Sequence, residues 1–145
     1  VGFGWINLHA SDRPTPRVEL LSWPYDVEQP VAPAVRDWGL ADPGAVTLDS
    51  RLVAREDVVQ ETRGPVGAED PSTIVLRQQR GLRRARTADT VEAALVGACD
   101  GELSVEQILD AVAQLLGHGP DGAAAARTSY LPVVRELVAE GFLTA

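Results

Sequence analysis

Five arginines lie within a ten-residue stretch of this chain and could together recognise an anion. The stretch from residue 77 to residue 86 reads Arg-Gln-Gln-Arg-Gly-Leu-Arg-Arg-Ala-Arg and contains no acidic residue. A guanidinium group donates paired hydrogen bonds to a phosphate or a carboxylate. The candidate partner-binding residues are therefore Arg77, Arg80, Arg83, Arg84 and Arg86. The alternative is a solvated strand end and loop whose arginines pair with the chain's own 21 acidic residues, which outnumber its 13 basic ones.

No other group of residues has the spacing of a catalytic or metal-binding site. The pair in Gly2-Phe3-Gly4 lies in a strand-like run that no helix follows, whereas a cofactor-binding glycine loop joins a strand to a helix. His9 and His118 are far apart, and neither has a further metal ligand at suitable spacing. No Gly-x-Ser-x-Gly motif positions a nucleophile. We therefore expect no catalytic, cofactor-binding or metal-binding residue.

The single cysteine is expected to be a small buried hydrophobe. Cys99 ends an apolar helical pattern, and one cysteine can form neither an intrachain disulfide nor a cysteine metal site. No apolar run is long enough to span a bilayer, and no signal-peptide pattern is present. The single buried cysteine fits a protein of the reducing cytoplasm, and we expect no membrane partner. The absence of a signal-peptide pattern says nothing about a longer parent protein.

Composition argues against nucleic acid as a general partner. The formal net charge is −8, whereas affinity for a phosphate backbone comes largely from Lys and Arg. All the basic residues are Arg, a bias typical of a GC-rich genome, and the chain contains no Met. Because Val1 cannot start a natural translation product, we expect a piece of a longer protein.

The elements that would position the arginines begin with a strand-rich segment. Two β-prone runs, residues 2–8 and 17–23, predict an antiparallel hairpin with a long proline-containing loop. A proline-dense irregular segment follows. A short helix is predicted over residues 33–38, with Pro33 in its first turn and Gly39 ending it.

The next part of the chain is ambiguous. Residues 48–52 and 57–61 each fit a strand or a helical turn. Residues 64–72 are rich in Gly and Pro and form the best candidate for an internal boundary. Residues 73–78 predict a strand, because β-branched residues open the run.

The last 60 residues have the clearest helical periodicity. Capping boxes at Asp89 and Ser104 predict two helices, the first ending near residues 100–101 and the second at Gly117. Residues 123–126 fit either a helix or a flexible insert. A third helix is predicted with Pro132 in its first turn, followed by a short strand at residues 142–143.

The order strand, three helices, strand is that of many winged-helix domains. We therefore predict an α+β fold in which an N-terminal β-hairpin and an irregular segment precede a winged-helix-like three-helix unit. Residues 1–70 would form the strand-rich segment and residues 71–145 the winged-helix-like domain. The predicted third helix carries Arg135 but also Glu136 and Glu140, which argues against sequence-specific DNA binding.

Several runs together resemble the C-terminal region of actinobacterial methyltransferases similar to the HemK-type protein-glutamine methyltransferases. The resemblance extends over nearly the whole chain, but none of these runs is catalytic. The runs are Gly-Phe-Gly-Trp-Ile-Asn-Leu at 2–8, Trp-Pro-Tyr-Asp-Val-Glu-Gln-Pro at 23–30, residues 76–78 with 81–84, residues 93–101 and residues 134–143.

This resemblance implies that a parent protein binds S-adenosylmethionine in a preceding doubly wound domain. Residues 1 to about 23 would then supply or follow the last antiparallel strands of that domain's sheet. The family's catalytic Asn-Pro-Pro-Tyr motif is absent; Ser22-Trp23-Pro24-Tyr25 lacks its Asn and its second Pro. No catalytic or cofactor residue can be carried over to this chain.

Two functions are compatible with these observations. The first is a non-catalytic accessory domain of an S-adenosylmethionine-dependent methyltransferase, which packs on the catalytic domain or assists recognition of a protein or RNA substrate. The second is a stand-alone acidic winged-helix module that binds a protein partner. An exposed strand edge at residues 2–8 would favour the first function, and a closed, polar N-terminal half would favour the second.

Overall fold

A computed structural model describes residues 6–10, 12, 16–21, 27–67 and 71–145. Helix α1 (Ala32–Leu40) and a 3-10 turn η1 (Pro43–Ala45) lead into strands β1 (Arg51–Ala54), β2 (Val58–Arg63), β3 (Thr73–Gln78) and β4 (Ala85–Ala88). Then follow α2 (Thr90–Ala98), β5 (Asp100–Ser104), α3 (Val105–Leu115), α4 (Pro120–Ala139) and β6 (Leu143–Thr144). The predicted α+β class is confirmed.

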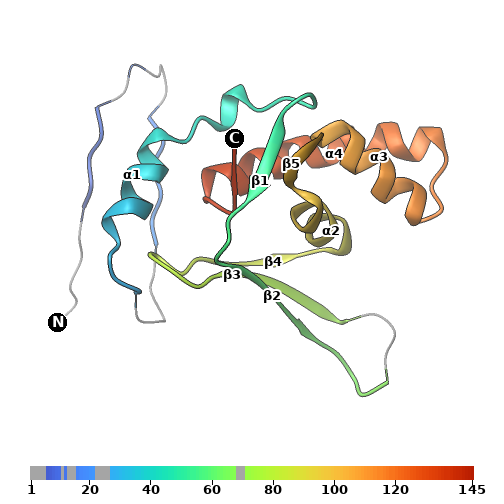
Figure 1. Ribbon diagram of the computed structural model, residues 1–145, viewed down its shortest axis with the longest axis horizontal. Coiled ribbons are helices and arrows are strands. Elements are labelled where there is room, and N and C mark those ends of the chain that lie inside the picture. Colours follow the sequence, from blue (N-terminus) through green and yellow to red (C-terminus); the bar gives the residue numbers. More distant parts are fainter. Residues whose placement is uncertain (1–5, 11, 13–15, 22–26, 68–70) are drawn as a thin grey trace.

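The strands form two small antiparallel sheets. One has the order β2-β3-β4 and is built from consecutive hairpins, whereas the other has the order β5-β1-β6 and joins strands that are distant in sequence. The three helices α2, α3 and α4 pack around the second sheet in a winged-helix-like arrangement, and the β2–β3 hairpin extends away from them (Figure 1). None of the described helices is both long and apolar enough to cross a membrane.

One hydrophobic core unites the helices with both sheets. Leu52 of β1 and Leu76 of β3 are buried together with Leu95, Leu109 and residues of the other helices. The remaining large members that are fully buried are Ile108, Val105, Val134, Leu137, Phe142 and Leu143. A smaller cluster of Val31, Ala34 and Leu82 attaches α1 to the turn between β3 and β4.

Local capping explains why two helices start where the sequence predicts. At α2, the Asp89 carboxylate accepts a hydrogen bond from the Glu92 amide (2.8 Å), while the Glu92 carboxylate accepts from the Asp89 amide (3.0 Å). Ser104 and Gln107 form the same reciprocal box at α3. Each box pairs two amide hydrogens that the helix itself cannot satisfy, so both predicted starts are confirmed.

The third helix differs from the prediction. Helix α4 begins at Pro120 and includes residues 123–126, so Pro132 lies inside the helix and its predicted place in the first turn was wrong. Gly119 precedes Pro120, and the alanines that follow have high helix propensity, which extends the helix toward its N-terminus. The residues predicted to end the first helix, 100–101, instead belong to β5.

The predicted N-terminal hairpin has no counterpart in the described residues. Residues 6–8 and 17–21 are not part of any strand, and residues 1–5 and 22–23 lie outside the described residues. The two runs that fitted either a strand or a helical turn, residues 48–52 and 57–61, overlap with strands β1 and β2. Strand β2 pairs with β3 across the loop at residues 64–72, so strands on both sides of the predicted boundary at residue 70 share one sheet.

Candidate functional site

The five arginines of the predicted binding site lie on β3, β4 and the turn between them. The turn itself is held by Asp57, a buried carboxylate that accepts a hydrogen bond from the Arg80 amide (2.9 Å) and one from Arg55 Nε (2.9 Å). Arg83 adopts a positive φ of 49°, a conformation that non-glycine residues seldom adopt. The structure therefore places Arg77 on the central strand β3, Arg86 on the edge strand β4, and the other three arginines in the turn that joins these strands.

Three of these arginines are paired with carboxylates of the chain itself. Arg77 Nε donates to Glu61 on the neighbouring strand (2.7 Å), and this partner lowers the pKa of Glu61. Arg84 binds Glu19 through both Nε (3.1 Å) and Nη2 (2.7 Å). Their guanidinium groups are thus already engaged, as the alternative interpretation expected. Whether the cluster also binds a partner stays a prediction.

Arg86 is bound by three carboxylates at once. Its guanidinium group donates to Glu92 of α2 (3.0 Å), to Glu136 of α4 (2.9 Å) and to Glu140 just after α4 (3.2 Å). We call this group the Arg86 clamp. It connects strand β4 to two helices, and with three acids around one base its net charge is negative.

The surroundings of the Arg86 clamp raise the pKa of both Arg86 and Glu140. Burial alone would lower the pKa of Arg86, but the hydrogen bond to Glu136 and the charges of Glu140 and Glu92 raise it above its ordinary value. Burial raises the pKa of Glu140, and Arg86 offsets this effect only in part. Arg86 therefore stays charged and unavailable for an outside anion, and Glu140 is more easily protonated than an ordinary Glu.

The N-terminal segment packs with its polar face inward. Arg17 donates to the backbone carbonyls of Trp38 and Ala41, and its guanidinium carbon lies 4.2 Å from the centre of a Trp38 ring. Glu19 binds Arg84, as described above. These contacts hold residues 16–21 against α1 and the end of β3-β4.

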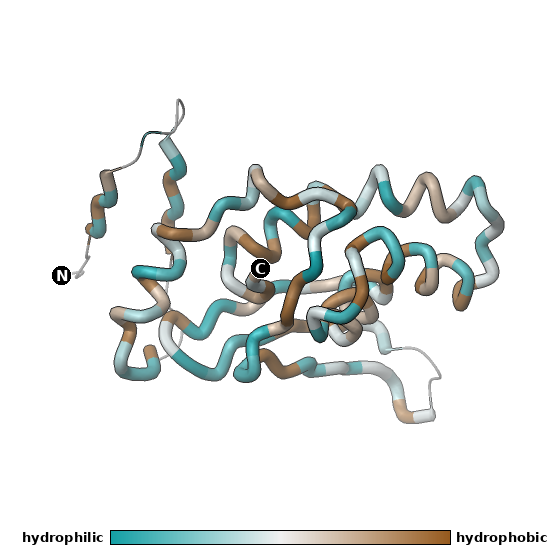
Figure 2. The backbone as a smooth tube through the Cα atoms, turned by 45° about the horizontal axis from the view of Figure 1, so that its top comes forward, coloured by the Kyte–Doolittle hydropathy of each residue, from teal (hydrophilic) through white to brown (hydrophobic). Residues whose placement is uncertain are grey.

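Two apolar side chains of the same segment are highly exposed. Val18 is 77% exposed and Leu20 93%, and in the nearby run Ile6 and Leu8 are exposed to 86% and 91%. Figure 2 shows hydrophobic and hydrophilic residues alternating along this separate N-terminal trace. We call Ile6, Leu8, Val18 and Leu20 the N-terminal apolar face. Exposed apolar residues in such a group are typical of a surface that another molecule covers.

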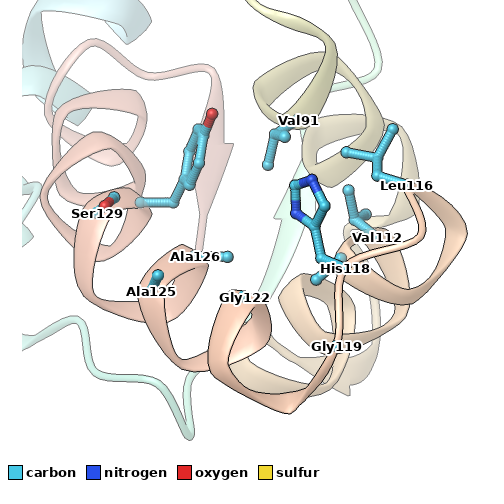
Figure 3. Close-up of a pocket in the computed structure, with 11 residues that line it drawn as sticks. Val91, Val112, Leu116, His118, Gly119, Gly122, Ala125, Ala126 and Ser129 are labelled. Carbon is cyan, nitrogen blue, oxygen red and sulfur yellow. The ribbon is translucent and has the colours of Figure 1, made fainter.

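A second feature is an apolar groove of about 510 Å³ between the helices. One side carries Val91 of α2, Val112 of α3 and Leu116 just after α3. The facing side carries Ala125, Ala126 and Ser129 of α4 (Figure 3). The lining also includes Ala113, His118, Gly119, Gly122 and Tyr130. We call this feature the helical groove. The sequence predicted its helices, but nothing in the sequence indicated that they leave this space open.

The single cysteine and the two histidines lie in separate parts of the structure. Cys99 is buried, and burial followed by the charge of Asp100 raises the pKa of its thiol to about 11. His9 lies beside Trp38 with ring centres 6.1 Å apart, and His118 is exposed in the loop before α4. Trp5 and Trp23 lie outside the described residues. Across the ranges that the structure describes, no group of three or more His, Cys, Asp or Glu could hold a metal ion.

The architecture and these surfaces define the chain as a winged-helix-like α+β protein with two apolar surfaces and an arginine-rich turn between β3 and β4. Residues 35–145 match the model of a family described as Domain of unknown function (DUF7782). The chain therefore belongs to that family. Among curated proteins, no match to the chain is found.

Proposed function

We propose that this chain is a non-catalytic accessory domain of an S-adenosylmethionine-dependent methyltransferase, as its resemblance to the HemK-type enzymes implies. In this proposal it packs on the catalytic domain of the parent protein and assists recognition of a protein or RNA substrate. S-adenosylmethionine would bind in the parent's catalytic domain and not in this chain. The proposed location is the cytoplasm, which the free, buried thiol of Cys99 supports.

The observation that carries the proposal is the orientation of the N-terminal segment. Its polar residues Arg17 and Glu19 face this chain, while Val18 and Leu20 face outward. A β-prone segment with its apolar side chains in water is stabilised when a second layer covers them. The edge of the catalytic domain's sheet would supply that layer, because residues 6–8 and 17–21 also have backbone groups that no strand of the described residues pairs.

The direct test is calorimetric measurement of S-adenosylmethionine binding by this chain and by a longer natural protein that contains it. We expect the longer protein to bind and this chain not to bind. If neither binds, the methyltransferase assignment is wrong. A second measurement addresses packing: in the longer protein, Leu8→Asp with Leu20→Asp should lower the melting temperature, whereas Leu115→Asp should not, although Leu115 is similarly exposed.

The alternative function is a stand-alone acidic module that binds a protein partner. The helical groove favours it, because this groove is apolar and does not involve the N-terminal segment. Two results together would favour the alternative over the first proposal. The longer protein would bind no S-adenosylmethionine, and its Leu8→Asp, Leu20→Asp variant would be as stable as the unmodified longer protein.

A further inference from the structure

The helical groove has walls that favour recognition of a helix over a strand. Its walls are the end of α3, the first half of α4 and one residue of α2. Backbone groups within α-helices are already hydrogen-bonded to one another, so these walls offer no free edge to an extended peptide. Recognition must therefore come from side-chain packing, which an amphipathic helix provides by inserting its apolar side chains.

Small residues make room for such a helix. Ala113, Gly122 and Ala126 line the groove, and a Cβ on Gly122 would lie only 2.7 Å from the Cβ of His118. The larger side chains, Leu116 and Tyr130, also line the groove. The Tyr130 hydroxyl donates to Asp89 (2.8 Å), which fixes the position of its ring. The volume of the groove is sufficient for a few apolar side chains of a partner.

The charges beside the groove are acidic. Asp89 caps α2 next to Val91, and Asp121 lies in the first turn of α4 next to Gly122; neither forms an ion pair with any base among the described residues. Arg127, the arginine in the same half of α4, is already bound to Glu106 and Asp110. Basic side chains of a partner would thus find two carboxylates that no arginine neutralises.

From this combination we infer that the helical groove binds a basic amphipathic helix of another protein. Its apolar side chains would pack between Leu116 and the alanines of α4, and its Lys or Arg residues would pair with Asp89 and Asp121. A second copy of this chain does not supply such a basic helix, because its described helices carry few bases and its net charge is −8. The inference uses a different surface from the N-terminal apolar face and does not depend on the methyltransferase assignment.

The test measures binding of a synthetic helix by fluorescence anisotropy. The probe is a labelled peptide of about 16 residues with Leu at positions i, i+3, i+4 and i+7 and Lys elsewhere, since shorter helices form poorly in water. Ala125→Trp places a bulky side chain in the groove, and the matched control Ala124→Trp places it on an exposed position of α4 outside the groove. We expect Ala125→Trp to weaken binding about tenfold or more and Ala124→Trp to leave it within about twofold.

Charge is tested separately. Asp121→Arg should weaken binding several-fold and reduce its dependence on salt, whereas Glu56→Arg, at an exposed site away from the groove, should not. Circular dichroism of each variant checks that the helices remain folded. A peptide with Glu in place of Lys should bind more weakly.

Three results would overturn the inference. Equal loss of binding in Ala125→Trp and Ala124→Trp would mean that the peptide does not occupy the groove. Equal affinity for the Lys and Glu peptides would mean that the acidic residues do not select a basic partner. Dimerisation of this chain that Ala125→Trp abolishes would identify a second copy as the occupant.

Discussion

Leu76 and Leu20 both belong to β-prone runs, yet Leu76 is 2% exposed and Leu20 is 93% exposed. Leu76 lies on β3, which has hydrogen-bonded strands on both sides and helices over one face. Leu20 lies in a segment whose Arg17 and Glu19 side chains bond to the rest of the protein, while Leu20 itself is in solvent. A β-prone run thus gives a buried strand in one region and exposed apolar side chains in the other. A strand pattern predicts burial only where the rest of the chain supplies a covering layer.

We expect the greatest loss of stability from a substitution in the packed region around Leu76. Leu76→Ala removes buried methyl groups and leaves a cavity in the hydrophobic core, so we expect the free energy of unfolding to fall by about 2–5 kcal/mol. Denaturant unfolding followed by circular dichroism measures this loss. A loss below about 1 kcal/mol would contradict the burial of this side chain.

The second-largest loss of stability is expected when the arginine of the Arg86 clamp is replaced. Arg86→Met keeps much of the side-chain volume but leaves Glu92 and Glu140 without their cation, so we expect a loss of about 2–3 kcal/mol at neutral pH. The loss should shrink as the pH falls, because protonated carboxyls no longer repel one another. Arg36→Met is a suitable control, since Arg36 forms only an exposed pair with Asp37. A loss that does not change with pH would contradict the electrostatic role of the clamp.

The third prediction concerns the ionisation of Tyr130, which lines the helical groove. Burial and then the hydrogen bond to Asp89 raise the pKa of Tyr130 to about 12 from an ordinary value of 10.0. The folded protein therefore holds this proton more tightly than the unfolded chain. The stability that Tyr130 contributes is fully present below about pH 10 and is lost as the pH rises toward 12.

Tyr130→Phe should accordingly cost about 0.5–1 kcal/mol at neutral pH, because the hydrogen bond is largely accessible to solvent. Its ionisation can be followed by absorbance near 295 nm in a Tyr25→Phe background, in which Tyr130 is the remaining tyrosine. A titration midpoint near 10 in that variant would show that the bond to Asp89 does not persist in solution.

We expect the smallest loss of stability from a substitution in the exposed N-terminal segment. Leu20→Ala should change the free energy of unfolding by no more than about 0.5 kcal/mol, because this side chain makes little contact with the protein. The same denaturant experiment as for Leu76→Ala gives the value. A loss above about 1 kcal/mol would mean that the N-terminal apolar face is buried against this chain in solution.

Features that depend on neighbouring residues were predictable from the sequence. The capping boxes at Asp89 and Ser104, helix α1 and strand β3 follow from short-range patterns, and all four are present. The burial of Cys99 followed from the apolar pattern around it. The α+β class followed from the order of these elements.

Features that depend on distant parts of the chain were not predictable. The distant partners of Arg77, Arg84 and Arg86 come from β2, from the N-terminal segment and from α4, and no spacing in the sequence relates them. The outward orientation of Val18 and Leu20 depends on the contacts of Arg17 and Glu19. The helical groove depends on how α3 and α4 diverge, which a helical periodicity does not determine.

The arrangement of the two sheets has a consequence for the order in which the protein folds. Strands β2, β3 and β4 are joined by short connections and can pair early, whereas Thr144 of β6 reaches Val53 of β1 across 91 residues. Closing so long a loop costs entropy before any contact is gained, and proteins with such pairings fold slowly. We therefore expect the hairpins of β2-β3-β4 to acquire protection from hydrogen exchange first during refolding, and β1 with β6 last.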